Sequence, residues 1–220
     1  MSSPDICACI TTAADIDAAV AVKDLVSLYE VRIDLIGDGW TEVARALPRP
    51  WIACNRLSSQ GGGYCGTETE RVDALQQAVE DGAAIVDVEM QAPDACSFIR
   101  GIKGRAAVLV SHHDFEKTDE WPALTEVVER QKDLGADICK VVTTARNVED
   151  TVTVLRLARH YSAHRIVTFA MGIPGTTSRI LAPLVGAEFT YASLAAGHEA
   201  APGQLTVAQL RAVYDAMGVI

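Results

Sequence analysis

The chain has 220 residues, of which 49% are hydrophobic, 22% charged and only 5% aromatic. The high apolar content and mixed charge exclude a disordered chain, and no run of about 18 uncharged apolar residues could span a bilayer. The formal net charge of −10 argues against nucleic acid and anionic membranes as partners. The chain opens without a charged and then apolar leader, so we expect a single cytoplasmic domain over residues 1–220.

The six cysteines show neither a disulfide framework nor a metal-binding pattern. No two have CxxC spacing, and several lie in apolar runs such as ICACI. Because no leader indicates an oxidising compartment, we expect reduced thiols packed in the core. A zinc site would need further ligands that the sequence does not offer at suitable spacing, so we expect no metal.

Short apolar runs alternate with amphipathic stretches from one end of the chain to the other. The strand-like runs cover residues 5–11, 28–35, 50–56, 83–90, 106–113, 136–143, 165–171 and 189–194. Helical apolar spacing covers residues 67–80, 124–134, 148–158 and 206–217. Thr67 followed by Glu70 forms a capping box that predicts the start of the first of these helices.

Eight β–α units in a chain of this length predict an α/β fold, a compact (β/α)8 TIM barrel. An open doubly wound sheet is the alternative. That fold normally has a Gly-rich phosphate-binding turn after its first strand, and this chain has TTAADI there. In a barrel the chemistry belongs at the carboxyl ends of the strands, so polar side chains should gather there.

The second predicted strand carries three charges in alternation, Glu30, Arg32 and Asp34. Residues two apart on a strand share a face, so these side chains are expected to face the barrel interior or its mouth. A solvated edge strand with a surface ion pair is the other interpretation, although a closed parallel barrel has no edge.

Charged residues also lie on the next two predicted strands. Arg56 ends the third strand and precedes a Gly-rich loop, where it is either a site residue or an ordinary surface charge. Asp87 and Glu89 share one face of the fourth strand. Two interpretations of these carboxylates are equally open. They pair with a neighbouring arginine, or they take part in catalysis.

Lys140, inside the sixth predicted strand, is the most informative single residue. A lysine is rarely buried without a role. Burial and nearby arginines would lower its pKa and free an amine that attacks ketones and aldehydes to form a Schiff base. The alternative is a lysine whose ammonium reaches solvent from the strand end. His112 and His113 end the fifth strand and point to opposite sides, so one can act as an acid and base at the mouth.

The loops after the last two predicted strands suit a bound anion and a lid. Arg179 follows the seventh strand in MGIPGTTSR, and its planar guanidinium could hold a carboxylate through two hydrogen bonds. The long loop after the eighth strand, AGHEAAPGQLT, contains Gln204. Its small residues suit a closing lid, although a plain β–α connection is equally compatible with them.

Taken in chain order, these pieces resemble class I 3-dehydroquinate dehydratase. They are Glu-x-Arg-x-Asp, an arginine after the third strand, Ser-x-His-Asp-Phe, Gly-Ala-Asp-x-x-Lys, Ser-Arg and Ala-Pro-Gly-Gln. The resemblance extends over nearly the whole chain. It implies a lyase of the shikimate pathway, and so of aromatic amino-acid biosynthesis, that removes water from 3-dehydroquinate to give 3-dehydroshikimate. It further implies a (β/α)8 barrel, a homodimer, and no metal or cofactor.

The resemblance also implies a role for each matching residue. Lys140 would form the Schiff base with the C3 ketone, and His113 would take the C2 proton and protonate the departing C1 hydroxyl. Arg179 and Gln204 would hold the substrate carboxylate and close the site. Contacts that orient the substrate and its ring hydroxyls would come from Glu30, Arg32 and Arg56.

Two positions depart from the family pattern. Gln60 stands where the family usually has a glutamate that partners the catalytic histidine. A neutral amide can hydrogen-bond the imidazole but cannot stabilise its charged form, so the pKa of His113 should fall. Ala200 replaces a lid serine, and loss of its hydroxyl would cost about 1–3 kcal/mol if a partner is left unpaired. Gln60, Asp87 and Glu89 are therefore expected to support the reacting residues.

Two other functions are compatible with parts of the pattern. An aldolase-like Schiff-base barrel would use the same lysine to break a C–C bond in a phosphorylated substrate, but the loop after the eighth strand has no lysine or arginine for a phosphate. A non-catalytic ligand-binding barrel would need neither Lys140 nor His113. The dehydratase is the function that accounts for all of these residues.

Overall fold

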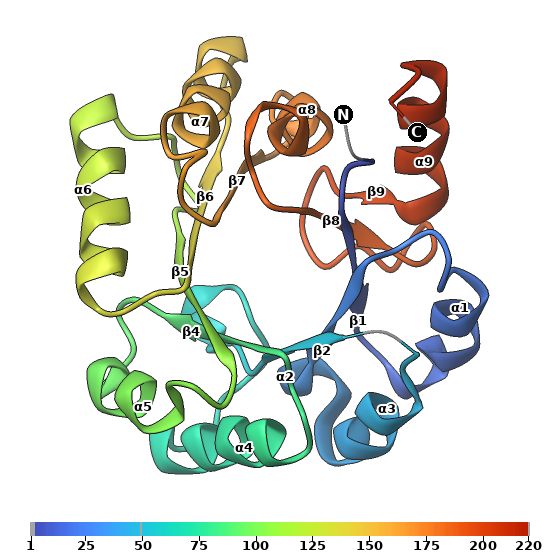
Figure 1. Cartoon of the computed structure of the whole chain (residues 1–220), viewed down its shortest axis with the longest axis vertical. Helices are drawn as coiled ribbons and strands as arrows, with labels where there is room; N and C mark the ends of the chain where they lie inside the picture. The colour runs from blue at the N-terminus through green and yellow to red at the C-terminus, as the bar shows by residue number, and fades with distance from the viewer. Residues whose placement is uncertain (1–2, 49, 220) are drawn as a thin grey trace.

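The computed structural model describes residues 3–48 and 50–219. Strands and helices alternate, with the strands curled around a central axis and the helices packed outside them (Figure 1). The sheet curls around this axis instead of lying open between two layers of helices, so the predicted barrel architecture is confirmed (Figure 1). Residues 1, 2 and 220, at the ends of the expected domain, lie outside the described residues.

The strands form one parallel sheet with neighbours in the order β7-β6-β5-β4-β3-β2-β1-β8-β9. Between β7 and β8 the described residues form no ladder, and the seam is closed by a hydrogen bond from Glu188 N to Ile166 O (2.7 Å). The strands are β1 (Ile6–Ile10), β2 (Leu28–Arg32), β3 (Trp51–Cys54), β4 (Ile85–Glu89), β5 (Ala107–His113), β6 (Ile138–Thr144), β7 (Ile166–Met171), β8 (Thr190–Ser193) and the short β9 (Leu205–Thr206).

Amphipathic helices cover the outside of the sheet. The four helices predicted from apolar spacing are present as α4, α6, α7 and α9, and the Thr67–Glu70 capping box is confirmed. The α-helices are α1 (Ile16–Ala21), α2 (Ile33–Ile36), α3 (Trp40–Ala46), α4 (Glu68–Glu80), α5 (Ala95–Ile102), α6 (Trp121–Asp133), α7 (Val148–His160), α8 (Thr176–Val185) and α9 (Val207–Ala216). Short 3-10 helices are η1 (Ala13–Asp15), η2 (Gly37–Gly39) and η3 (Ser58–Gln60).

The second strand is shorter than predicted. It ends at Arg32, and α2 takes over at Ile33, so Asp34 does not continue the alternation of a strand. The carboxylate instead accepts two hydrogen bonds from Arg32 (2.9 and 2.6 Å) and one from Gly63 N (2.9 Å). The single helical turn of α2 ends at Gly37, whose φ of 73° is accessible to glycine at little cost. Arg32 is therefore held by its own neighbour in sequence.

Alternation along the strands separates two cores. Outward side chains such as Val31 and Val110 pack against the helices. Inward side chains at the amino-terminal end of the barrel form an apolar floor. They are Cys7, Leu28, Ile52, Ile85, Leu109, Ile138, Val167 and Phe189.

Two positions further along each strand, the same interior face becomes polar. These positions hold Cys9, Glu30, Cys54, Asp87, Ser111, Lys140, Phe169 and Tyr191. Because the floor beneath them is apolar and buried, their charges can be balanced only by one another or by a ligand at the mouth. The predicted concentration of polar residues toward the carboxyl ends of the strands is confirmed.

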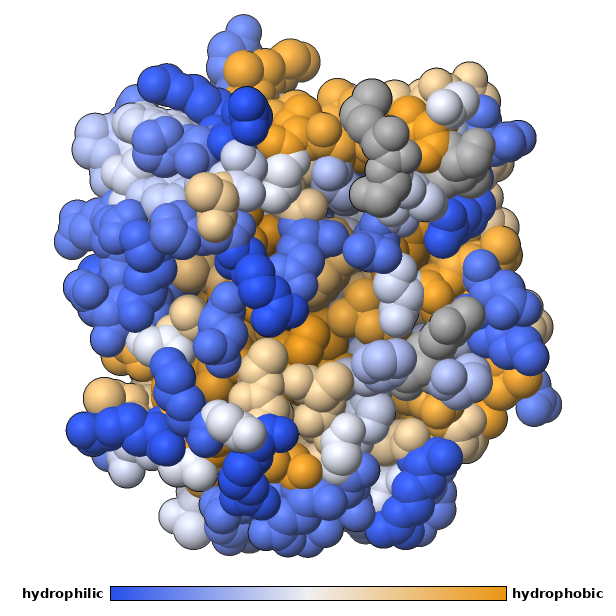
Figure 2. Space-filling view, viewed as in Figure 1, coloured by the Kyte–Doolittle hydropathy of each residue, from blue (hydrophilic) through white to orange (hydrophobic). Residues whose placement is uncertain are grey.

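Hydrophilic and hydrophobic side chains are unevenly distributed over the visible face of the molecule (Figure 2). In Figure 2 hydrophilic side chains occupy most of the rim of the face seen, while hydrophobic atoms show mainly between them toward the middle. Among the described residues, no helix combines the length and the apolar character that crossing a membrane would require.

Candidate active site

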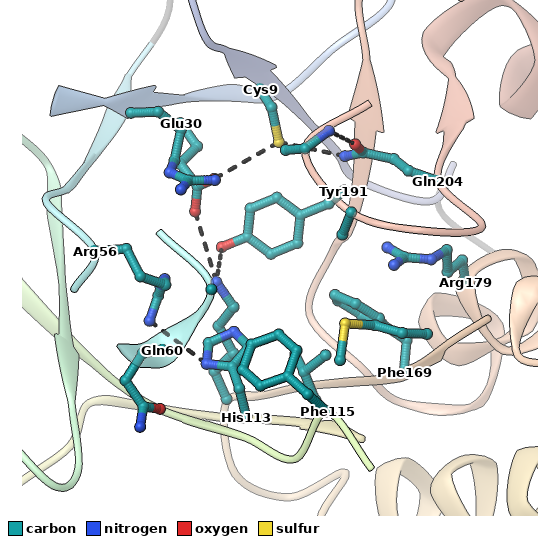
Figure 3. Close-up of a pocket in the computed structure, with 17 residues that line it drawn as sticks. Cys9, Glu30, Arg56, Gln60, His113, Phe115, Phe169, Arg179, Tyr191 and Gln204 are labelled. Atoms are coloured by element: carbon teal, nitrogen blue, oxygen red, sulfur yellow. Dashed lines mark hydrogen bonds and ion pairs between the residues drawn. The ribbon is translucent and has the colours of Figure 1, made fainter. Parts of the chain in front are cut away.

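A cavity opens at the carboxyl ends of the strands (Figure 3). Of the residues predicted for the site, Asp87 and Glu89 are buried behind the cavity wall. The predicted residues that line the cavity are Glu30, Arg32, Arg56, Gln60, His113, Lys140, Arg179 and Gln204.

Lys140 is buried, with 4% of its surface exposed, and does not reach solvent. Its Nζ donates to Asp87 Oδ2 (2.9 Å) and to Tyr191 Oη (3.1 Å), and it lies 3.6 Å from Glu30 Oε1. Burial alone would lower the pKa of Lys140, but the Asp87 and Glu30 carboxylates outweigh it and raise that pKa. The expectation of a lowered pKa for Lys140 is therefore wrong, because the sequence could not show which carboxylates surround the amine.

Asp87 is the centre of a buried charge network. Arg56 contacts it directly, and Ser111 links the two by accepting from Arg56 (2.9 Å) and donating to Asp87 (2.6 Å). Burial would raise the pKa of Asp87, but the Arg56 and Lys140 charges hold it well below its usual range. Asp87 is thus an ionised counter-charge beneath the amine rather than a proton donor.

Glu89 holds the wall behind this network. It accepts from Leu57 N (3.1 Å) and from Arg71 (2.8 Å), and lies 3.8 Å from Arg56. Arg71, on α4, is buried, with 1% of its surface exposed. The sequence analysis did not predict it as a residue near the site. The pairing of Glu89 with arginines favours a supporting role over contact with a ligand.

His113 ends β5 at the edge of the cavity. Its Nδ1 lies 3.5 Å from Arg56 Nη1, and its ring stacks on Phe115 with centroids 5.9 Å apart. Burial lowers the pKa of His113 well below its usual value, and the Arg56 and Lys140 charges lower it further. The imidazole is therefore neutral and able to accept a proton. His112 points the other way, to Gln91 (2.9 Å), as the alternation along the strand predicts.

Gln60 reaches the same wall from η3, but without the hydrogen bond to the imidazole that the sequence suggested. Its Oε1 is buried and has no hydrogen-bond partner within the described part of the chain. The lowered pKa of His113 agrees in direction with the expectation for a glutamine here. The causes are burial and two neighbouring cations, with no contribution from an amide contact.

Arg179 lies on the opposite side of the cavity and is 1% exposed. Its guanidinium carbon sits 4.2 Å from the centroid of the Phe169 ring, and one nitrogen donates to Pro202 O (3.2 Å). Its Nε has no partner, and residues 3–48 and 50–219 give it no ion pair. Burial lowers the pKa of Arg179 to about 10. A buried guanidinium without a counter-charge is a receptor for an anion.

The loop of residues 195–204, here called the lid, closes this side. Gln204 Oε1 accepts from Ala200 N (2.7 Å), and Gln204 Nε2 donates to Cys9 Sγ (3.4 Å). Gln204 is thereby tied both to the lid backbone and to the barrel. Ala200 and Ala201 line the cavity with methyl groups, so no hydroxyl is offered where the family pattern places a serine.

Within the described part of the chain, one group of side chains has the ligand types and spacing to hold a cation. Potential ligand atoms of Glu30, Cys54 and Asp87 lie within 4.8 Å of one another. Lys140 already contacts both carboxylates, and Arg56 lies on Asp87 and Cys54 (3.3 Å). A metal ion there would face two fixed positive charges, so the arrangement favours the lysine as the cation of this site.

Several residues of the cavity were not identified from the sequence. Tyr191 contacts the Lys140 amine, Cys9 contacts Glu30 (3.6 Å) and Gln204, and Phe169 carries the Arg179 guanidinium. The alternating run FTYASL was the available signal for Tyr191. Tyr191 shares one face of the strand with Phe189 and Ser193, and that face points into the barrel.

The comparisons with known proteins agree with this site. The sequence model of the type I 3-dehydroquinase family matches residues 6–220. A 3-dehydroquinate dehydratase from Dehalococcoides mccartyi is 38% identical over 214 residues, which cover 97% of this chain and 96% of that protein. One from Methanococcus maripaludis is 32% identical over 192 residues, covering 86% and 87% of the two chains.

A solved type I 3-dehydroquinate dehydratase from Clostridium difficile has the same fold, with a TM-score of 0.86 at 22% identity, over 99% of this chain and 93% of that one. At that identity the likeness speaks for the barrel alone. The match of the family over almost every residue, together with relatives of nearly equal length, decides the assignment. The chain belongs to the type I 3-dehydroquinase family.

Proposed function

We propose how the residues of this cavity carry out the family's reaction, the loss of water from 3-dehydroquinate in the shikimate pathway. As a member of the family the chain is a hydro-lyase. The observation that carries the assignment of roles is a buried lysine amine at the floor of a cavity that also holds a neutral histidine and an unpaired arginine. In this proposal Lys140 is the nucleophile, His113 the acid and base, and Arg179 the carboxylate receptor.

The first step removes a proton from the amine. The Lys140 ammonium is stabilised by Asp87 and Glu30, and an ammonium is no nucleophile. The neutral His113 imidazole takes the proton, a transfer that the raised pKa of Lys140 and the lowered pKa of His113 make unfavourable, so only a small fraction of the amine is free at any time. The free amine attacks the C3 ketone, and a proton passes from its nitrogen to the former carbonyl oxygen to give the carbinolamine. The resulting imidazolium returns the proton to the carbinolamine hydroxyl, which leaves as water. Asp87 stays ionised and stabilises the iminium that forms on Nζ.

The iminium then draws electrons from the neighbouring carbon and acidifies its C2–H bond. His113, neutral again, takes the C2 proton and delivers it to the C1 hydroxyl, which leaves as water. The low pKa of His113 keeps the neutral form predominant before this step and makes its imidazolium a strong acid for the second half, the protonation of the C1 hydroxyl. Hydrolysis of the imine by water frees the product and restores the amine.

The wall of the cavity that contains Arg179 and Gln204 positions the substrate. The substrate carboxylate pairs with the Arg179 guanidinium, whose Nε has no other partner, while Gln204 keeps the lid over the ring. Glu30, Arg32 and Arg56 supply hydrogen bonds for ring hydroxyls. Arg32 and Arg56 are both held by carboxylates, so they act as fixed donors.

Borohydride trapping tests the covalent role directly. Incubation with 3-dehydroquinate and sodium borohydride should add the reduced ligand to the peptide that contains Lys140. Lys132→Met is a matched control, since Lys132 is a surface lysine paired with Glu129 (2.8 Å) and should leave labelling unchanged. An adduct on another lysine, or the absence of an adduct, would overturn the proposal.

We also propose that the chain works as a homodimer in the cytoplasm, as the family resemblance implies. Exposed apolar side chains support an association surface. Val148 and Val152 on α7 are 67% and 58% exposed, and Ile173 before α8 is 89% exposed. The two segments are joined by a hydrogen bond from Thr151 to Pro174 O (2.8 Å).

Light scattering at micromolar concentration should give twice the chain mass, and Val152→Lys should lower the measured mass. A monomer mass for the unaltered chain would refute this.

A further inference from the structure

Tyr191 lies against the reacting amine, and the chemistry proposed so far does not use it. The residue is 3% exposed and sits on the inward face of β8. Its ring packs edge-on against Phe169 (6.0 Å) and Phe189 (5.4 Å), and the Lys140 Nζ lies 4.4 Å from the ring centroid. Two aromatic neighbours therefore fix the ring, and its hydroxyl ends 3.1 Å from Nζ. Figure 3 shows the ring between Glu30 and Arg179.

The direction of that hydrogen bond leaves the tyrosine proton free. An ammonium has three donors and no acceptor, so Tyr191 Oη accepts from Lys140. Among residues 3–48 and 50–219 no acceptor takes the hydrogen of the Tyr191 hydroxyl. Burial raises the pKa of Tyr191 well above its usual value, and the Glu30 carboxylate adds to the effect. The phenol therefore keeps its proton and can donate it to a ligand in the cavity that it lines.

The intermediate before the imine brings an acceptor to this position. In a carbinolamine, the hydroxyl and Nζ are bonded to the same carbon, so a donor 3.1 Å from Nζ is also within reach of that hydroxyl. As the ammonium becomes an amine and then a carbinolamine nitrogen, it keeps fewer hydrogens that Tyr191 Oη can accept. The Tyr191 O–H bond is then a nearby donor for the developing charge on the carbinolamine oxygen.

We propose that Tyr191 is a further residue of the reaction, which orients the Lys140 amine before attack and hydrogen-bonds the carbinolamine hydroxyl while the imine forms and hydrolyses. This inference rests on the proposed Schiff base. When the C–O bond breaks, its electron pair leaves with oxygen and the Nζ lone pair forms the C=N bond. The proton that completes the departing water comes from the His113 imidazolium. Tyr191 keeps its own proton and lowers the barrier by hydrogen bonding alone.

Tyr191→Phe tests this because it removes one oxygen and retains the ring contacts. The rate of imine formation, measured by rapid mixing with 3-dehydroquinate and quenching with borohydride, should fall about tenfold to a hundredfold. The amount of adduct reached at long times should stay the same. With C2-deuterated substrate, the isotope effect on kcat should shrink, because imine formation becomes the slow step. A structural role alone would not move the isotope effect.

Two controls separate the possible failures. Tyr214→Phe removes another buried hydroxyl, which donates to Ile180 O (2.9 Å) outside the barrel, and should leave the trapping rate unchanged. Quinate has an alcohol at C3 and cannot form an imine, so its affinity should be equal in the unaltered chain and in Tyr191→Phe if the cavity is intact.

The outcomes are distinguishable. Trapping by Tyr191→Phe within twofold of the unaltered rate, or a slower rate with an unchanged isotope effect, would overturn the inference. A loss of quinate binding in Tyr191→Phe would show that Tyr191 maintains the shape of the cavity, and it would also overturn the inference. If the unaltered chain gives no adduct on Lys140, the Schiff base itself fails and the role of Tyr191 falls with it.

Discussion

The two sides of the cavity treat charge in opposite ways. On the side formed by β2 to β6, here called the paired side, Arg56 and Lys140 both lie on Asp87, and Arg32 lies on Asp34. On the side formed by β7, β8 and the lid, here called the receptor side, Arg179 rests on an aromatic ring and pairs with no carboxylate of the described residues. The protein therefore neutralises the groups to which we assign the chemistry and leaves uncompensated the arginine that we propose as the carboxylate receptor.

This difference indicates what neutralises each charge. On the paired side it is a carboxylate of the protein, and on the receptor side we propose that it is the substrate carboxylate. A buried cation without a counter-charge costs free energy, and the fold tolerates that cost where a substrate carboxylate removes it. The Lys140 ammonium is already satisfied, so it must exchange its proton before it reacts. Each prediction below breaks one side of this comparison and leaves the other intact.

The largest effect is expected for the amine of the paired side. Lys140→Met should lower kcat/KM by about 10⁴-fold or more, since the covalent route is lost. Substrate affinity should fall much less, because Arg179 is untouched. Steady-state kinetics and a direct binding measurement check both points. Activity within tenfold of the unaltered chain would remove Lys140 from the reaction.

His113→Ala should slow turnover by about 10²–10⁴-fold while an adduct with Lys140 can still be trapped slowly. Imine formation and elimination both need a proton acceptor, and water replaces the imidazole poorly. His112→Ala is the matched control, since that side chain points away to Gln91, and it should retain most of the activity. Equal losses in the two variants would contradict the assignment of His113.

The two sides diverge most clearly in their arginines. Arg179→Met should raise KM about 10²-fold or more, because the carboxylate loses its partner, with a free energy of unfolding that is unchanged or higher. Arg56→Met should instead lower the free energy of unfolding by about 3–5 kcal/mol, because it breaks a buried pair and leaves Asp87 with a smaller counter-charge. Denaturant titration and kinetics on both variants test the contrast. A large stability loss in Arg179→Met would break it.

The Arg56 effect should also depend on pH. The pKa of Asp87 is lower in the folded chain than in the unfolded chain, where it is about 3.9. The stability from this pairing is therefore present above about pH 4 and is lost as pH falls through the folded value. The difference in unfolding free energy between Arg56→Met and the unaltered chain should shrink when the titration is repeated in acid.

The smallest effect is expected at Gln60. Gln60→Glu places a negative charge on the wall beside His113 and should raise the pKa of the imidazole, so the acid limb of kcat/KM should move to higher pH by about one unit. Ser58→Glu on the same 3-10 helix is a charge-matched control, since Ser58 does not line the cavity. An unmoved acid limb would show that the two side chains do not interact.

Some features of the molecule could be predicted from local pattern. Strand positions followed from alternation, the Thr67–Glu70 box marked a helix start, and lysine in an apolar strand marked a buried residue that lines the cavity. The end of β2 could not be predicted, because Ile33 and Leu35 suit a strand as well as the one-turn helix that Gly37 ends. The protonation of Lys140 was predicted wrongly for a related reason, since it depends on residues from β2 and β4.

The sequence by itself determined the order of strands and helices and the residue types at the carboxyl ends of the strands, since period-2 and period-3.6 patterns are local. Only the tertiary structure decided which charges meet. The barrel brings Asp87, Tyr191 and Glu30 onto the Lys140 amine from positions dozens of residues away, and it leaves Arg179 without a carboxylate. Electrostatic energy depends on distance in space and on burial, and neither can be read from spacing along the chain.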